Sequence, residues 1–314
     1  MANLPKPEVI LTHESDLDGY VAGLLLQRLS EKLFGAPTHL EAWNYVAWQK
    51  REPIEKTAWV TDLTFEPRLD KPGWAVIDHH QTTTAPQYAQ LIHDAAKSAS
   101  LLCYELCREH GLANAELDRL VHLSNLADLF LDDAPEFPLA LDYANLIKIY
   151  GFWNLHAVTG GRLETLLDHP LLEVMAVKRR VEDPIGYEWS KGNIERISPT
   201  LGLVNTTVGN PNLIVHRLLV EKTTPYPVLM TLYVKANRTV VVSFRSQNGE
   251  ALPIARQLQG GGHENACGAT LPRTVQNEGD AIDYLRRTLD PASTKPTGLN
   301  PLADLLSAFE PKNG

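Results

Sequence analysis

Short apolar runs alternate with longer amphipathic stretches over the first half of the chain. The apolar runs have the length of buried strands, and the amphipathic stretches repeat apolar residues at helical spacing. The strand-like runs are 8–12, 58–61 and 74–77, and the helix-like stretches are 20–34, 98–110, 116–131 and 138–150. This order predicts an α/β fold in which a mostly parallel N-terminal sheet carries helices on both faces.

The pattern changes near residue 200. Residues 171–197 are charged and helix-prone, and we expect Pro184 and Gly186 to interrupt this helix. The β-rich runs that follow, 201–208, 214–219, 228–234 and 239–244, predict a smaller C-terminal α/β domain. The expected organisation is a first domain over 1–170, a helical connector over 171–199, a second domain over 200–290 and a tail over 291–314 with a short helical piece near 302–309.

The composition is that of a globular protein with two domains, since 314 residues exceed one typical domain. A formal net charge of −9 argues against binding long duplex nucleic acid, which depends on neutralising many phosphates with Lys and Arg. Three cysteines are too few and too poorly spaced for a disulfide framework or a zinc site. There is no signal-peptide pattern and no apolar run of the roughly 18 residues that span a membrane. We therefore expect a cytoplasmic protein without a membrane partner.

Metal-capable side chains occur where the strand-like runs end. His13, Asp16 and Asp18 follow the first run, and Asp62 follows the second. The third run ends in Asp78-His79-His80, a polar triplet that is costly at the end of a buried strand unless a partner compensates it. In open α/β sheets, ligands bind beyond the carboxyl ends of the strands. The triplet therefore indicates one corner of a metal site.

A further candidate ligand is Asp128, on an otherwise apolar helix-like stretch, and Asp132 is an alternative one helical turn later. The candidate metal ligands are His13, Asp16, Asp18, Asp62, His79 and Asp128. Six nitrogen and oxygen ligands suit two ions about 3.5–4 Å apart that share a bridging carboxylate. Oxygen-rich ligation with some imidazole favours Mn²⁺ or Mg²⁺ over zinc or copper. A lone Asp after a strand is usually a helix N-cap, but a separate cap at every strand end explains the whole set less well.

Residues suited to phosphate binding occur in the second domain. Arg245 lies in an apolar run and offers a planar guanidinium to phosphate oxygens. Three consecutive glycines expose backbone N–H groups, and the histidine after them adds a donor. The candidate substrate-binding residues are Arg245, Ser246, Gly260, Gly261, Gly262 and His263. The alternative interpretations are a flexible turn for the three glycines and a solvated edge residue for Arg245.

Taken in order, these motifs resemble those of the DHH phosphoesterases. The N-terminal motifs are His13-Glu14-Ser15-Asp16-Leu17-Asp18-Gly19, Val60-Thr61-Asp62, Ile77-Asp78-His79-His80 and Ala127-Asp128. Val242-Ser243-Phe244-Arg245-Ser246 and Gly260-Gly261-Gly262-His263 resemble the DHH-associated C-terminal domain, with its arginine-bearing strand and its loop of three glycines and a histidine. The resemblance spans roughly residues 8 to 290.

The resemblance implies a role for each residue. The metal ligands would be His13 and Asp16 on one ion, Asp18, His79 and Asp128 on the other, and Asp62 on both. Asp78 would orient a neighbouring imidazole or accept from the backbone, and His80 would contact the scissile phosphate or the leaving oxygen. The residues of the second domain would hold the remote end of the substrate, with closure about the connector near Pro184 and Gly186.

The substrate we expect is a very short oligonucleotide or a small nucleotide, cleaved to 5′-mononucleotides as by an oligoribonuclease. Digestion of long single strands calls for a basic groove, which an acidic chain does not suggest. A 3′,5′-bisphosphonucleotide phosphatase, a phosphodiesterase for cyclic or linear dinucleotides and a catalytically inactive nucleotide-sensing module are the alternatives. Trp43, Tyr45 and Trp48 are candidates to stack a base, with packing at least as good an explanation. The oligomeric state stays open, a homodimer included.

Overall fold

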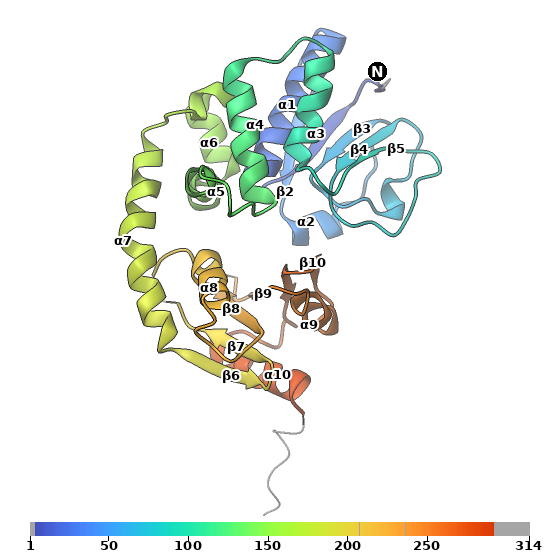
Figure 1. Ribbon diagram of the computed structural model, residues 1–314. Helices are drawn as coiled ribbons and strands as arrows, with labels where there is room; N and C mark the ends of the chain where they lie inside the picture. The colour runs from blue at the N-terminus through green and yellow to red at the C-terminus, as the bar shows by residue number, and fades with distance from the viewer. Residues whose placement is uncertain (1–3, 207, 236, 292–314) are drawn as a thin grey trace, which may run out of the picture. The chain divides into compact units, whose positions relative to one another are not determined.

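The computed structural model describes residues 4–206, 208–235 and 237–291 (Figure 1). Its internal contacts divide the chain into two compact units, Met1–Arg180 and Val181–Gly314. The helical piece expected near 302–309 lies outside the described residues. Among the helices of the described part, none is long and apolar enough to cross a membrane.

The first unit is built on a five-stranded parallel sheet in the order β2-β1-β3-β4-β5. The strands are β1 Val9–His13, β2 His39–Trp43, β3 Ala58–Thr61, β4 Trp74–Asp78 and β5 Gln90–His93. The helices are α1 Leu17–Phe34, α2 Tyr45–Lys50, α3 Ala99–Glu109, α4 Ala115–Asp128, α5 Phe137–Tyr150 and α6 Phe152–Thr159, with 3₁₀ turns η1 Pro67–Leu69 and η2 Leu163–Leu166. The predicted α/β class with a parallel N-terminal sheet is confirmed.

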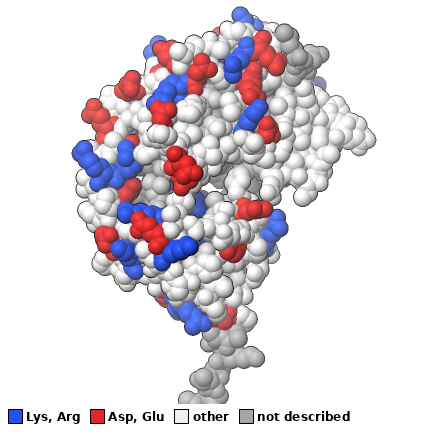
Figure 2. All heavy atoms as spheres, viewed as in Figure 1, with Lys and Arg blue, Asp and Glu red and all other residues white. Residues whose placement is uncertain are grey.

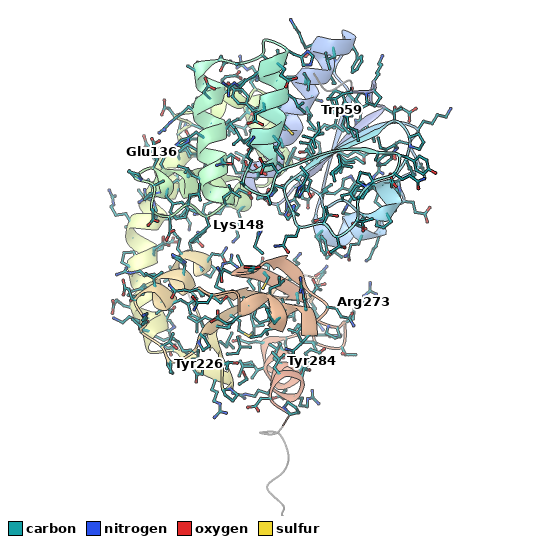
Figure 3. The ribbon with its side chains drawn as sticks, turned by 45° about the vertical axis from the view of Figure 1, so that its right-hand side comes forward. Trp59, Glu136, Lys148, Tyr226, Arg273 and Tyr284 are labelled. Atoms are coloured by element: carbon teal, nitrogen blue, oxygen red, sulfur yellow. The ribbon has the colours of Figure 1, made fainter. Side chains whose placement is uncertain are left out.

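Two apolar cores cover the two faces of this sheet, because successive residues of a strand point to opposite sides. Trp59, labelled in Figure 3, belongs to the core beneath the long helices, whereas its neighbour Val60 belongs to the other core. Helices α1, α3 and α4 lie side by side over the first face (Figure 1). The second face packs against the short helix α2 through Trp48 and against η1 through Leu69. Long helices therefore cover the first face, and short helical segments cover the second.

An ion pair connects α1 to η2. Both terminal nitrogens of Arg28 donate to the Glu164 carboxylate, and Asn114 Nδ2 donates to it over 3.3 Å. The hydrogen bonds from Arg28 lower the pKa of Glu164 to about 2. A carboxyl group whose pKa is depressed by folding stabilises the folded state above its unfolded pKa of about 4.3 and loses that contribution as the pH falls.

We therefore expect Glu164→Gln to reduce the free energy of unfolding by about 1–3 kcal/mol at pH 7, with the difference from the parent shrinking between about pH 5 and pH 2. Urea unfolding followed by circular dichroism at pH 7, 4 and 3 measures it. Glu109→Gln, at an exposed position on α3, is the control and should change little at any pH. If Glu164→Gln lowers the free energy of unfolding equally at pH 7 and pH 3, the ion pair is not the source of the loss.

The second unit contains a six-stranded mixed sheet in the order β10-β11-β9-β8-β7-β6, in which β7 and β8 run parallel and the other neighbours antiparallel. The strands are β6 Ile194–Ser198, β7 Leu201–Val204, β8 Val228–Val234, β9 Val240–Arg245, β10 Gly261–His263 and β11 Ala266–Thr270. The helices are α8 Pro211–Val220, α9 Ala251–Gln257 and α10 Glu278–Leu289. Phe244, Leu252 and Ala281 mark the core between this sheet and its helices. The expectation of a second α/β domain is confirmed.

The β-rich character predicted for 214–219 is wrong, because this run lies within helix α8. The Asn210 side chain accepts from the Asn212 N–H over 3.0 Å, and Pro211 occupies the first turn of the helix. The buried residues of the helix, at helical spacing, are Ile214, Val215, Leu218 and Leu219. Such a short apolar run fits either periodicity, so the cap identifies the helix.

Helix α7, Leu171–Lys191, spans the boundary of the two units and continues through Pro184, so the predicted interruption is wrong. Proline removes one backbone donor from a helix, but packing on the same turn compensates. Asp183 Oδ1 accepts from the Asn210 N–H over 2.7 Å. A Cβ on Gly186 would lie 1.9 Å from the Val208 carbonyl oxygen. Gly186 therefore allows the chain at Val208 to lie close to α7.

Candidate metal centre

The acidic and imidazole residues of the N-terminal motifs come together at the carboxyl edge of the parallel sheet. His13 ends β1, Asp62 follows β3, and Asp78 ends β4 directly before the two histidines. The residues that the structure brings together are His13, Asp16, Asp18, Asp62, Asp78, His79, His80 and Asp128. Parallel strands place their carboxyl ends at one edge, which explains how positions far apart in the sequence meet there.

The turn from β1 into α1 is held tightly against the end of the strand. Asp16 is the N-cap of α1 and accepts from the Gly19 N–H over 3.0 Å, while Thr12 Oγ1 donates to the Gly19 carbonyl over 2.6 Å. A Cβ at Gly19 would lie 2.2 Å from the His13 carbonyl oxygen. Gly19 therefore lets the helix begin directly beside His13. The motif alone does not reveal this packing role of Gly19, for which a glycine in the first helical turn is the signal.

His13, Asp16 and Asp62 form one group of possible ligands, whose ligand atoms all lie within 4.8 Å of one another. His13 Nδ1 is 2.6 Å from Asp16 Oδ2 and 3.5 Å from Asp62 Oδ2. Burial alone would lower the pKa of His13, but the two carboxylates outweigh it and raise that pKa well above its ordinary value. The group thus concentrates negative charge around one imidazole.

Asp18, His79 and Asp128 form a second group, also within 4.8 Å. His79 Nε2 is 3.4 Å from Asp128 Oδ2. Asp18 is buried, and its two oxygens accept from the N–H groups of Ala99 and Ser100 at the start of α3. Burial and the charge of Asp62 raise the pKa of Asp18 to about 6. The second group therefore also favours a positive partner.

Asp62 belongs to the first group and also faces the second, and a further group within 4.8 Å joins it to Asp78, His79 and His80. Its Oδ2 faces His13, while its Oδ1 is 3.6 Å from His79 Nε2 and 3.9 Å from His80 Nδ1. Burial would raise the pKa of Asp62, but the neighbouring His13 and His79 imidazoles hold it well below its usual range. Its backbone has φ +54°, in the left-handed region that few residues other than glycine adopt. Asp62 is thus placed, at some conformational cost, where its two oxygens face different groups.

The side chains of Asp78 and His80 contact each other. Asp78 is completely buried, and its Oδ1 is 2.8 Å from His80 Nδ1. His80 is partly exposed at the edge of the site. Burial would lower the pKa of His80, but the hydrogen bond and charge of Asp78 raise it to about 9. Asp78 therefore fixes the orientation of the His80 ring.

Buried carboxylate oxygens without partners indicate whether this cluster suits metal ions. Within the described part of the chain, Asp62 Oδ2, Asp78 Oδ2 and Asp128 Oδ2 are buried and have no hydrogen-bond partner. A buried acceptor left in this way costs free energy, and a cation at carboxylate oxygens removes that cost. Oxygen ligands with some imidazole suit hard divalent ions. The residues present therefore fit a divalent metal centre.

The position of Asp128 relative to Asp132 distinguishes the two candidates for the last ligand. Helix α4 ends at Asp128, so Asp132 does not lie one turn further along the same helix. Asp132 is exposed in the turn that follows, whereas Asp128 belongs to the group with Asp18 and His79. The geometry therefore favours Asp128.

Arg245 and Ser246 lie in the second unit, at the end of β9. Arg245 is half-buried opposite Ala266 of β11, and its Nη1 donates to the Phe244 carbonyl over 3.0 Å. Ser246 is buried; its hydroxyl donates to Asn265 Oδ1 over 3.0 Å and accepts from the Ala251 N–H over 3.1 Å. The hydroxyl of Ser246 thus fixes the loop before α9.

The glycine run is a short edge strand rather than the expected loop, because Gly261–His263 pairs with β11 as β10. A Cβ at Gly260 would lie 2.1 Å from the Gly268 carbonyl oxygen, and Gly262 has φ +129°. At Gly261 nothing lies within 4 Å of such a Cβ. Two glycines are therefore required by packing, while Gly261 leaves exposed backbone at the sheet edge.

Of the three aromatic candidates for stacking, which lie at the end of β2 and in α2, the prediction for Trp48 is wrong. It is 1% exposed, and the Arg68 guanidinium lies 4.7 Å from its ring centroid. Tyr45 is exposed at the start of α2. Trp43 is partly buried, with Arg51 5.4 Å from its ring centroid. The buried aromatic ring of α2 therefore belongs to the core of the sheet.

Two solved structures have a similar fold. A pGpG-specific phosphodiesterase, PggH from Vibrio cholerae, is 15% identical with a TM-score of 0.52, and the match covers 90% of this chain and 99% of that one. The DHH domain of a member of a family of ribosomal proteins is 16% identical with a TM-score of 0.52, covering 89% and 87%. No family model and no curated protein matches the sequence. The likeness shows that the chain has the fold of DHH-domain proteins, as the motifs predict.

Proposed function

We propose that this chain, which has the DHH-domain fold, is a metal-dependent phosphoesterase that hydrolyses short oligonucleotides or small nucleotides to 5′-mononucleotides. The observation that carries the proposal is the position of Asp62, whose two oxygens face two separate groups of possible ligands. Paired cation sites that share a carboxylate are suited to in-line displacement at phosphorus. PggH, described as a phosphodiesterase specific for pGpG, has the same fold and supports the linear-dinucleotide alternative.

The proposed ligands are those of the two groups: His13 and Asp16 for one ion, Asp18, His79 and Asp128 for the other, and Asp62 for both. Two Mn²⁺ ions, or Mg²⁺, would supply an activated water and positive charge against the charge that develops on the phosphoryl oxygens. Asp78 holds His80 through Nδ1. His80 is thereby oriented to contact the scissile phosphate or the leaving oxygen.

The second unit would bind the remote end of the substrate through Arg245, Gly261 and His263. Support comes from the position of Arg245 at the end of β9 and from the open space at Gly261. Ser246 would contribute by fixing the loop that follows Arg245, since its hydroxyl already bonds Asn265 and Ala251. Arg245 would supply charge-assisted hydrogen bonds to a phosphate or sugar.

We expect Arg245→Ala to raise KM about 10- to 100-fold with a smaller change in kcat, because a lost hydrogen bond from a charged group costs about 1.5–3 kcal/mol. Steady-state kinetics on a 5′-phosphorylated RNA dimer measure both constants. Arg287→Ala, which removes an exposed arginine of α10, serves as the control and should leave them unchanged. A kcat loss without any change in KM would argue for a catalytic rather than a binding role of Arg245.

The proposed activity is tested by incubating the full chain and Mn²⁺ with a panel of substrates. The panel contains 5′-phosphorylated RNA dimer and pentamer, a long single strand, linear diguanylate, bisphosphoadenosine, a cyclic dinucleotide and pyrophosphate. We expect release of 5′-mononucleotides from the dimer and pentamer at higher rates than from the long strand. Equal rates on pentamer and long strand would overturn the preference for short substrates. Binding of nucleotides without turnover of any substrate would overturn the enzyme proposal in favour of a sensing module.

The expected partners and setting are part of this proposal. On the face that Figure 2 shows, basic and acidic side chains are interspersed rather than gathered into a basic track, and the net charge is −9. This supports small nucleotides over long duplexes as ligands. The three cysteines are buried free thiols, which supports a reducing, cytoplasmic setting.

A further inference from the structure

A pocket beside the metal centre takes no part in the mechanism above. It lies within the first unit and has a volume of about 370 Å³. Its lining residues are Glu14, Ser15, Ile147, Lys148, Gly151, Phe152, Trp153 and Asn154. Glu14 and Ser15 connect His13 to Asp16, so one wall of the pocket is continuous in the chain with the first ligand group. A substrate whose phosphate meets that group therefore has this pocket within reach.

We propose that this pocket binds a nucleobase of the substrate, with the indole of Trp153 as its stacking surface; the proposal rests on the proposed function. Trp153 is 46% exposed beside the pocket. Its neighbour Phe152 is buried, and the two ring centroids are 4.9 Å apart. Tyr20 of α1 contacts Phe152 edge to face at 4.8 Å. The exposed ring thus stands on a buried aromatic support, which holds it in place for stacking.

The backbone between α5 and α6 places this ring. Gly151 ends α5, where its N–H donates to the Ile147 carbonyl over 2.8 Å, and its φ of +82° turns the chain directly into α6. Without a side chain, Gly151 also leaves space on the pocket wall, since the nearest atom to a Cβ there is Asn154 Nδ2 at 3.9 Å. Lys148, labelled in Figure 3, adds a cation to the lining from the last turn of α5. The space at Gly151 leaves room for a flat ligand beside the Trp153 ring.

Glu14 gives the pocket a means of distinguishing purines. Its Oε1 accepts from Asn44 Nδ2 over 3.0 Å, and its N–H donates to the Trp43 carbonyl over 3.1 Å, which fixes its position. A carboxylate only accepts hydrogen bonds. Guanine presents two adjacent N–H donor groups on its Watson–Crick edge, whereas adenine has an acceptor nitrogen in the ring position. The proposed ligand class is therefore a guanine nucleotide, bound in preference to an adenine nucleotide.

The stacking role is tested by binding of GMP and AMP to the full chain in EDTA, measured by calorimetry, and by kcat/KM on guanine dimers with Mn²⁺. We expect Trp153→Ala to lower GMP affinity and kcat/KM roughly tenfold, and Trp153→Phe to restore most of both. Trp189→Ala removes a tryptophan of similar exposure, 50%, from α7 and should change neither. Trp153→Ala with the affinity and kcat/KM of the parent would overturn the proposal.

The role of Glu14 is tested by the ratio of GMP to AMP affinity, again in EDTA so that metal binding does not enter. We expect the parent to prefer GMP and Glu14→Gln to lower the ratio several-fold, because an amide presents a donor as well as an acceptor. Glu109→Gln, outside the pocket, should keep the parent ratio. An unchanged ratio in Glu14→Gln would overturn the assignment to guanine.

These experiments separate the pocket from the proposed activity. If the parent binds GMP through Trp153 but hydrolyses no phosphoester, the base-binding role of the pocket is supported and the enzyme proposal is contradicted. If the parent and Trp153→Ala hydrolyse dimers equally well, the enzyme proposal is supported and the base-binding role of the pocket is contradicted.

Discussion

Replacing Asp62 by asparagine is expected to lower kcat/KM for phosphodiester hydrolysis by about 10³-fold or more. Asp62 Oδ2 is 3.5 Å from His13 and Oδ1 is 3.6 Å from His79, so one carboxylate serves both groups of proposed ligands. An amide replaces one of these acceptor oxygens with a donor, which disturbs both groups at once. Asparagine tolerates the left-handed backbone of this position, φ +54°, so the effect should be chemical rather than conformational.

The measurements are turnover, calorimetric titration with Mn²⁺ and the rise in Tm that Mn²⁺ produces. Because a ligand of the folded state stabilises it, the rise in Tm should be smaller for Asp62→Asn than for the parent. Asp168→Asn is a matched control, since Asp168 also has a left-handed backbone, φ +55°, and lies outside the cluster. Parent-like turnover and Mn²⁺ stabilisation in Asp62→Asn would rule out its bridging role.

The parts of the site that follow strands could be predicted from the sequence. Apolar runs locate β1, β3 and β4, and the parallel arrangement then brings His13, Asp62 and Asp78 to one edge. This inference requires only that the sequence shows where each strand ends. The assignment of each ligand to an ion stays a prediction, because it depends on where the ions themselves bind.

Other features depend on contacts that the local sequence does not contain. The run 214–219 is an exception, since the cap at Asn210 and Pro211 that marks the helix stands directly before it in the sequence. The continuation of α7 through Pro184 depends on packing against residues near 208. The pocket joins Glu14 to Trp153, which lie far apart in the sequence, so no local motif marks it. The partner of Asp78 could be an imidazole or the backbone as far as the sequence goes, and the contact with His80 appears only in the folded chain.

Gly19→Ala is expected to reduce both stability and activity, because of the contact between α1 and the end of β1. A Cβ at this position would lie 2.2 Å from the His13 carbonyl oxygen and 2.8 Å from the His13 Cβ. The neighbouring atoms belong to the backbone and to the base of a side chain, so they cannot rotate away. The helix must shift, at a cost of about 1–3 kcal/mol or more. Since Asp16 and Asp18 flank the start of this helix, such a shift moves both relative to His13, and we expect kcat/KM to fall by about 10²-fold.

Two further alanine variants separate the loss of activity from the loss of stability. At Gly23, one turn further along α1, a Cβ would lie 2.7 Å from Thr12 Cγ2, so Gly23→Ala should destabilise the first unit with a smaller effect on turnover. At Gly279, in the first turn of α10, the nearest atom would be 3.4 Å away, and alanine should raise stability there by about 0.5–1 kcal/mol. Thermal unfolding, Mn²⁺ titration and turnover of the three variants make the comparison. If Gly19→Ala loses no more activity than Gly23→Ala at equal stability, the close contact with His13 serves folding alone. A selective loss in Gly19→Ala would mean that the first turn of α1 sets the distance between the two groups of ligands.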